Sequence, residues 1–264
     1  MPSSLGLDDR NPRAGANPGY QLDVGRVISQ SFSITASNVL PFGLVGLICY
    51  LPVLFVQAIL AVAPPSQPEA LIGVGIAVAV AQALASLVLN GSLTFGVMRH
   101  LQGDPAGAGE IIQAGLSSLG RVFIVSLMVG IMTMLGLVFC IVPGVIVMCM
   151  NWVAVPVAVV EQPGSTQALS RSQDLTAGTR LPVFAVLLVI GLIVGGVGFF
   201  GSVVVAVVGE ASGSPALRSV ATIALTIFTI PFECLKAASA AVGYHELRMN
   251  REGVGLDDLV RVFE

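Results

Sequence analysis

Long apolar runs separated by short polar segments dominate the chain. A helix needs about 20 mainly apolar residues to cross a bilayer. Six runs approach or exceed this length, and the predicted passes cover residues 40–62, 71–98, 122–139, 145–160, 181–208 and 216–244. Pro52 should kink the first pass or open its hydrogen bonding, and Val142-Pro143-Gly144 predicts a tight turn after the third. The pattern predicts an all-α polytopic membrane protein with six transmembrane helices.

Amphipathic segments precede the first, third and fifth passes. They are predicted as helices at about residues 23–38, 107–121 and 166–177, where apolar side chains recur among charged and amide side chains. A helix of this kind lies in the membrane interface with its apolar face toward the hydrocarbon. The sequence therefore predicts three interfacial helices, each followed by a pair of membrane passes.

The first and third of these segments share a pattern. Identical residue types recur 141 positions apart, at Ser29/Ser170, Ser31/Ser172, Thr35/Thr176, Ala36/Ala177, Leu40/Leu181 and Pro41/Pro182. The second segment is a weaker copy. Repetition of one supersecondary unit predicts three repeats of interfacial helix–TM–TM, at about residues 23–98, 107–160 and 164–248. We expect them to surround a pseudo-axis along the membrane normal, with the interfacial helices forming a cytoplasmic collar.

The ends of the chain differ from this central domain. Residues 1–22 are rich in Pro, Gly, Ser, Asn and Asp without an apolar core, which predicts a disordered cytoplasmic tail and no signal peptide. Residues 249–264 are predicted as a cytoplasmic tail with a short amphipathic segment at 256–263.

Composition narrows the classes of function. Hydrophobic residues make up 55% and charged residues 10%, against about 25% charged residues in soluble domains. The mean hydropathy is +0.91. A net charge of −3 leaves no basic surface for nucleic acid. The four cysteines all lie in apolar runs, without a metal-binding spacing, so we expect small buried side chains and neither a metal nor a cofactor.

Arginines flank the predicted passes unequally. Those expected on one side are Arg10, Arg13, Arg26, Arg99, Arg121, Arg171, Arg180, Arg248, Arg251 and Arg261, whereas Arg218 is expected alone on the other. Positive charges collect on the cytoplasmic side of short loops. We therefore expect both termini and every interfacial helix to be cytoplasmic. An even number of passes agrees with this, because it places both termini on the same side.

Several residues together resemble a known family. They are Val142-Pro143-Gly144, Pro156, Glu161, Gly164, Ala168-Leu169, Arg171-Ser172, Leu175-Thr176, Gly178, Tyr244 and Leu247-Arg248. This pattern resembles a poorly characterised group of bacterial six-helix inner-membrane proteins described as glycerophosphoryl diester phosphodiesterase membrane domain-like, a name taken from fusions to that enzyme. The likeness covers about residues 20 to 250. It implies fold and an inner-membrane location, and it carries over no catalytic residue, because the chain has no soluble catalytic domain.

Glu233 and Lys236 form the first candidate site. They are three residues apart in the sixth pass, and Glu233 precedes His245 by 12 residues, about 18 Å along a helix and near the bilayer middle. A charge at that depth costs about 2.5–3.5 kcal/mol, so each should find a partner. The pair could line a path for ions, protons or headgroups. Alternatively, it is a self-neutralising pair that fixes helix packing, or Lys236 reaches toward the cytoplasmic face.

The second candidate site is a charged cluster around the connector between the fourth and fifth passes, formed by Glu161, Arg171, Asp174 and Arg180. These residues could bind a lipid headgroup or a protein partner. The alternative is a set of exposed surface pairs, each worth less than about 1 kcal/mol.

The sequence favours a non-enzymatic function. It contains no Ser–His–Asp set, no paired carboxylates at helical spacing and no Cys/His cluster. The leading hypothesis is a membrane-organising protein, or one that binds lipid or a partner through its cytoplasmic interfacial helices, the partner being another protein or a second copy. The alternative is a small transporter or channel that uses the Glu233–Lys236 pair.

Overall fold

The computed structural model describes residues 22–62 and 68–252, with side chains left undescribed at 68–71. Within these residues the chain is helical and contains no strand. The elements are α1 (Val24–Ser37), α2 (Val39–Val62), α3 (Pro68–Leu101), α4 (Ala108–Phe139), α5 (Ile141–Met150), α6 (Ala154–Val160), α7 (Ser165–Thr176), α8 (Arg180–Ser212) and α9 (Pro215–Glu252).

Six spans in the described part are long and apolar enough to cross a membrane. They are Val39–Val62, Ile72–Leu101, Ala108–Phe139, Ile141–Val160, Arg180–Ser212 and Pro215–Glu252. Large apolar side chains such as Leu40, Val62 and Phe139 lie exposed on their outer surfaces, as expected where lipid replaces water. The prediction of an all-α chain with six spans is confirmed, and these spans mark a multi-pass membrane protein.

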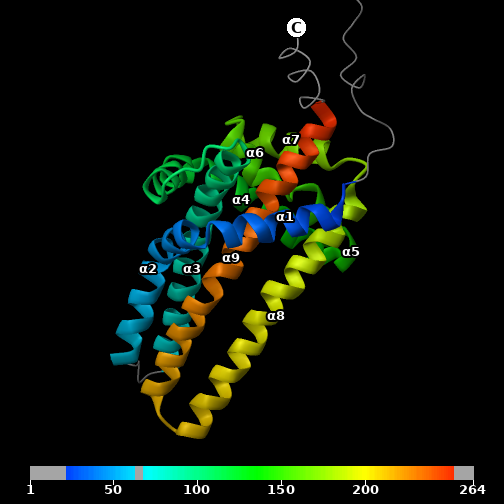
Figure 1. The fold of residues 1–264 in the computed structure, drawn as a ribbon. Helices are drawn as coiled ribbons and strands as arrows, with labels where there is room; N and C mark the ends of the chain where they lie inside the picture. Colours follow the sequence, from blue (N-terminus) through cyan, green and yellow to red (C-terminus); the bar gives the residue numbers. More distant parts are fainter. Residues whose placement is uncertain (1–21, 63–67, 253–264) are drawn as a thin grey trace, which may run out of the picture.

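Helix α9 lies at the centre of the arrangement. It contacts α1, α2, α3, α6, α7 and α8. Small side chains, including Ala238 and Ala241, make its buried face, which lets neighbouring helices approach closely. A Cβ atom on Gly243 would lie 2.2 Å from Cη2 of Trp152, so only glycine leaves room for the indole. In Figure 1, α9 and α8 form a hairpin whose turn lies at the opposite end from α7, and α1 runs across the long helices. We call the end that carries α1, α7 and the first turns of α4 the collar end.

The predicted first and third amphipathic helices are present as α1 and α7. Asp23 caps α1, because its carboxylate accepts a hydrogen bond from the Arg26 amide at 3.0 Å. Proline is the third residue of both following helices, Pro41 in α2 and Pro182 in α8. There the missing N–H costs no intrahelical bond, but the ring prevents the preceding helix from continuing through. The two proline positions therefore separate each amphipathic helix from its membrane span.

The second amphipathic segment is not a separate helix. It forms the beginning of α4, which runs without a break from Ala108 to Phe139. This stretch contains no proline, so no residue interrupts the hydrogen bonding where the interfacial part meets the apolar part. The prediction of a distinct second interfacial helix was wrong for this reason.

The predicted Pro-Gly turn is also wrong. Val142-Pro143-Gly144 lies in the first turns of α5, and the chain reverses at Cys140, which has extended φ and ψ values of −173° and 155°. Pro143 is tolerated there because the amides of a first helical turn need no intrahelical acceptor. Gly144 instead allows close packing, since its Cβ would lie 2.5 Å from Leu137 Cδ2. Cys140 is exposed at this turn, whereas the other three cysteines are buried as expected.

The predicted fourth pass is interrupted between α5 and α6, around Asn151 and Trp152. Because the helix breaks after Met150, the Met150 carbonyl oxygen does not accept a hydrogen bond from a following helical turn. The hydroxyls of Ser172 and Thr176 on α7 donate to this oxygen at 2.9 and 3.3 Å. Two side chains on α7 thus supply the hydrogen bonding that the interrupted helix lacks.

The described residues near the chain ends differ from the predicted tails. Residues 1–21 and the amphipathic segment at 256–263 lie outside the described residues. Leu22, assigned to the amino-terminal tail, is buried against the core. Helix α9 continues to Glu252, so residues 249–252, assigned to the carboxy-terminal tail, are helical.

Candidate functional site

The connector between α6 and α7 brings Glu161 and Arg171 together. Gln162 adopts a left-handed φ of 53°, and Pro163 follows it, so the chain turns sharply. The amide of Gly164 then donates to the Gln167 side chain at 3.2 Å and begins α7. Across this turn, Arg171 Nε donates to both carboxylate oxygens of Glu161, at 3.3 and 3.2 Å. The predicted cluster therefore has a structured ion pair at its centre.

Helix α9 completes this cluster with three further side chains. The hydroxyl of buried Tyr244 donates to Glu161 Oε1 at 2.8 Å. Arg248 donates to the same hydroxyl oxygen at 3.2 Å and, through Nε, to Glu252 at 2.8 Å. Glu252 also accepts from Arg171. We call Glu161, Arg171, Tyr244, Arg248 and Glu252 the collar network.

The collar network is electrically balanced, because two arginines face two carboxylates. Its charged side chains are between 22% and 40% exposed, so the surrounding solvent weakens each ion pair. The sequence analysis missed its three α9 members. Their spacing of four residues, Tyr244 to Arg248 to Glu252, places them on one face of a helix, and this is the signal that could have identified them.

Asp174 and Arg180 lie apart from the collar network. Asp174 is exposed on α7. Arg180 is the first residue of α8 and lines a hollow between α8 and α5. The four residues predicted as one site are therefore split between an ion-paired cluster and two separate surface positions.

Glu233 and Lys236 form the expected ion pair on α9. The pair lies nearer the collar end than the helix spacing predicts. The thiol of the adjacent Cys234 approaches the Phe42 carbonyl at 3.6 Å, and Phe42 lies about 4.5 Å along α2 from its first residue. The Lys236 side chain is 45% exposed and that of Glu233 21%. The two charges neutralise one another close to the corner between α1 and α2.

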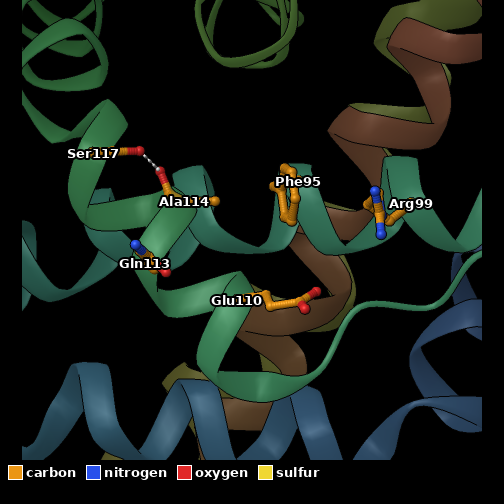
Figure 2. Close-up of a pocket in the computed structure, with 6 residues that line it drawn as sticks. All are labelled: Phe95, Arg99, Glu110, Gln113, Ala114 and Ser117. Atoms are coloured by element: carbon orange, nitrogen blue, oxygen red, sulfur yellow. Dashed lines mark hydrogen bonds between the residues drawn. The ribbon is translucent and has the colours of Figure 1, made fainter.

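A polar hollow of about 450 Å³ lies between α3 and α4 near the collar end. Figure 2 shows Phe95 and Arg99 on one helix and Glu110, Gln113, Ala114 and Ser117 on the other. The Arg99 guanidinium lies 6.0 Å from the centre of the Phe95 ring and 2.5 Å from Asp104. Its Nε is buried without a hydrogen-bond partner. In the sequence, Arg99 indicated only the orientation of the chain, and no residue pattern predicted this hollow.

These arrangements suit binding of polar headgroups or of another protein surface. Among the described residues, no three His, Cys, Asp or Glu side chains gather in a way that could hold a metal ion. The hollow between α3 and α4 presents a cation, a carboxylate, an amide and a hydroxyl, which together can hydrogen-bond a charged group.

Comparison with known proteins yields no relative. No family model, no curated protein and no solved structure matches the chain.

Proposed function

We propose that this chain is a non-enzymatic inner-membrane protein whose cytoplasmic collar, formed by α1, α7 and the first turns of α4, organises the membrane by binding lipid headgroups or a protein partner. The observation that carries the proposal is the distribution of charge. In the described part, the collar end holds Arg26, Arg99, Arg121, Arg171, Arg180, Arg248 and Arg251, whereas the opposite end holds Arg218. Arginine collects on the cytoplasmic side, which supports a cytoplasmic collar and cytoplasmic termini.

The surfaces of the collar helices fit this role. On α7 the exposed side chains are polar, among them Gln167, Ser170 and Asp174. On α1, Arg26 and Phe32 are both exposed, and arginine and phenylalanine are both common on helices that lie at the headgroup level of a bilayer. The hollow around Arg99 and Glu110 adds a recess in which a headgroup would find both signs of charge.

We infer that the collar is built from three related units. Burial supports the alignment of the first and third, because many of the residues 141 positions apart share one environment. Buried pairs are Val27/Ala168, Ser31/Ser172, Ile34/Leu175, Phe42/Val183 and Val45/Val186, and one of the exposed pairs is Leu40/Leu181, at 77% and 78%. Packing adds support, since α1 contacts α9, α4 contacts α3 and α7 contacts α6. The first helix of each unit thus packs against the last span of another unit. A pseudo-axis relating the three units would produce this packing.

The resemblance to the glycerophosphoryl diester phosphodiesterase membrane domain-like group belongs to the same proposal. It implies the bacterial inner membrane as location and carries no catalytic residue.

The alternative function is a small transporter or channel. Its support is the ion pair of Glu233 and Lys236 within a span. Against it, the two charges satisfy one another, and the aligned positions of the first unit hold Ser92 and Phe95 instead of a charged pair.

Native mass spectrometry of the full chain, extracted together with a patch of its own membrane, tests the proposal. We expect a lipid or a protein subunit to leave with the chain at fixed stoichiometry. The double substitution Arg26→Gln with Phe32→Ser on the outer face of α1 should reduce that retention, because it removes the charge and the ring that face the headgroups. Arg218→Gln at the opposite end is the matched control and should leave it unchanged.

Two results would overturn the proposal. One is the absence of any component at fixed stoichiometry. The other is a component that survives the α1 substitutions but is lost when Glu233→Gln and Lys236→Met are combined, which would place binding at the ion pair and favour transport.

A further inference from the structure

An apolar groove lies between α5 and α8. It consists of a hollow of about 420 Å³ and a second of about 230 Å³, and the two share Val145 and Phe184 as lining residues. Every other lining residue of both hollows is apolar or small except Arg180. Ile141 and Leu181 at its edge are 72% and 78% exposed. The groove therefore opens on the lipid-facing surface of the bundle.

The groove lies beside the first half of the broken fourth span. Helix α5 ends at Met150, and its packing against α8 buries only part of each helix. At the aligned position in α2, Gly46 packs closely against α9, because a Cβ there would lie 2.4 Å from Ile230. Leu187, 141 residues later, instead lines the smaller hollow beside α8.

Arg180 is the cation at the collar end of this groove. The other described arginines of that end are engaged: Arg26 with Glu246, Arg99 with Asp104, Arg121 with Gln162, Arg171 with Glu161, Arg248 with Glu252 and Arg251 with the Ala177 carbonyl. Among the described residues, Arg180 has neither a hydrogen bond nor an ion pair to a carboxylate. A guanidinium left without a counter-charge at the rim of an apolar groove is complementary to an anion with an apolar body.

The beginning of α8 adds a partial positive charge beside that of Arg180. No side chain caps this helix of 33 residues, because the Thr179 hydroxyl donates instead to the Thr176 carbonyl at 3.2 Å. The positive end of the helix dipole is therefore directed at the place where Arg180 lies. At the position 141 residues earlier the chain has Val39, so the first unit lacks this cation.

We propose that this groove binds one anionic phospholipid, with the phosphate at Arg180 and an acyl chain along Phe184 and α5. The inference rests on the proposed function, because it assumes that the protein binds lipid and then names the lipid class and the site. Three features select this occupant: the unpaired cation at headgroup level, the apolar lining, and the opening toward the bilayer. A hydrocarbon chain gains burial in the groove, and the phosphate gains a charge-assisted bond that no carboxylate of the described chain supplies.

The test uses the full chain in nanodiscs that contain equal amounts of phosphatidylglycerol and phosphatidylcholine. Native mass spectrometry then measures which lipid stays bound after the disc is removed. We expect one retained phosphatidylglycerol. In Arg180→Gln its retention should fall about fivefold, the effect of one arginine at a membrane surface, and Arg180→Lys should restore most of it because the charge remains.

A groove-filling substitution tests the apolar half of the site. Gly191 lines the smaller hollow, and a Cβ there would meet open space, so Gly191→Leu adds a larger apolar side chain to the groove and should displace the lipid. Gly195→Leu is the matched control, because Gly195 lies one turn further along α8, is also open and does not line the groove. It should retain the lipid.

The outcomes separate this inference from the proposed function. If neither Arg180→Gln nor Gly191→Leu changes the retention of phosphatidylglycerol, the groove is not the site. Lipid binding by the collar would still stand. Equal retention of the two lipids by the unsubstituted chain would overturn the proposed lipid class. Retention of a protein subunit alone, with no lipid, would overturn the lipid branch entirely.

Discussion

The hydroxyl of Tyr244 links charged groups from three elements at the collar end. It donates to Glu161 at the end of α6 and accepts from Arg248 on its own helix, while Glu161 also pairs with Arg171 of α7. Tyr244 is fully buried, so its hydroxyl would lose water without these partners. The collar network thus depends on a neutral side chain that supplies the only hydrogen bond from the core to Glu161 within the described chain.

Tyr244→Phe should lower the free energy of unfolding by about 1.5–3 kcal/mol, because a hydrogen bond to a charged group is lost while the ring remains. Chemical unfolding in mixed micelles measures the change. Tyr50→Phe is the control, since Tyr50 is a similarly buried tyrosine on α2 whose hydroxyl has no hydrogen bond in the described part of the chain. Equal losses in the two variants would show that the Glu161 contact contributes nothing.

Sequence reasoning reached part of this network. The charges of Glu161 and Arg171 flank a polar connector, so proximity in the chain placed both in one predicted cluster, and in the structure they form an ion pair. Tyr244 and Glu252 follow them by about 80 residues. Their contact depends on how α9 is rotated against α6 and α7, which residue spacing within one helix does not specify.

The packing of α3 against α4 depends on small side chains. A Cβ on Gly115 would lie 1.8 Å from Ser92 Oγ and 3.0 Å from the Ser92 backbone nitrogen. Ser92 is fully buried. Glycine at this crossing brings two backbones together, which is the common way for membrane helices to gain packing energy.

Gly115→Ala should destabilise the protein by about 1–3 kcal/mol, because the two helices must separate to admit the methyl group. The midpoint of thermal unfolding in detergent reports the effect. Gly120→Ala in the same helix is the matched control, since its Cβ would meet open space, and it should be neutral or slightly stabilising. Adding Ser92→Gly should recover part of the loss; no recovery would place the strain elsewhere.

The predictions of individual helices were right or wrong for reasons that can be identified in the sequence. Apolar periodicity located α1 and α7, because amphipathic spacing is a local property. It did not show that α4 is continuous, since the same amphipathic spacing is compatible with a break or with none, and only the two prolines of α2 and α8 impose one. The Pro-Gly pair before α5 is equally compatible with a turn and with a first helical turn.

The arrangement of the whole molecule predicts which surfaces face each side of the membrane. Ser170 is exposed on α7, and Ser212 is exposed at the α8–α9 turn, so the two serines lie at opposite ends of the bundle (Figure 1). With six spans and a cytoplasmic collar, the two positions should be accessible from opposite compartments.

Cysteine labelling tests this arrangement. In a background with exposed Cys140 replaced by serine, Ser170→Cys should react with a membrane-impermeant maleimide in inside-out vesicles, and Ser212→Cys in intact spheroplasts. The buried native cysteines provide the unlabelled reference. Reaction of both positions from the same side would exclude six spans, and the reverse sidedness would exclude a cytoplasmic collar.

The sequence alone determined the all-α character, the six membrane spans and the amphipathic helices α1 and α7. Each of these follows from local hydrophobicity or helical spacing, which act over a few turns of one helix.

Only the tertiary structure decided the continuous α4, the five-residue collar network, the polar hollow at Arg99 and the groove beside Arg180. These features arise where helices distant in the chain meet. Their contacts depend on helix rotation and crossing, which are set by the packing of small and large side chains across the interface rather than by the order of residues along one helix.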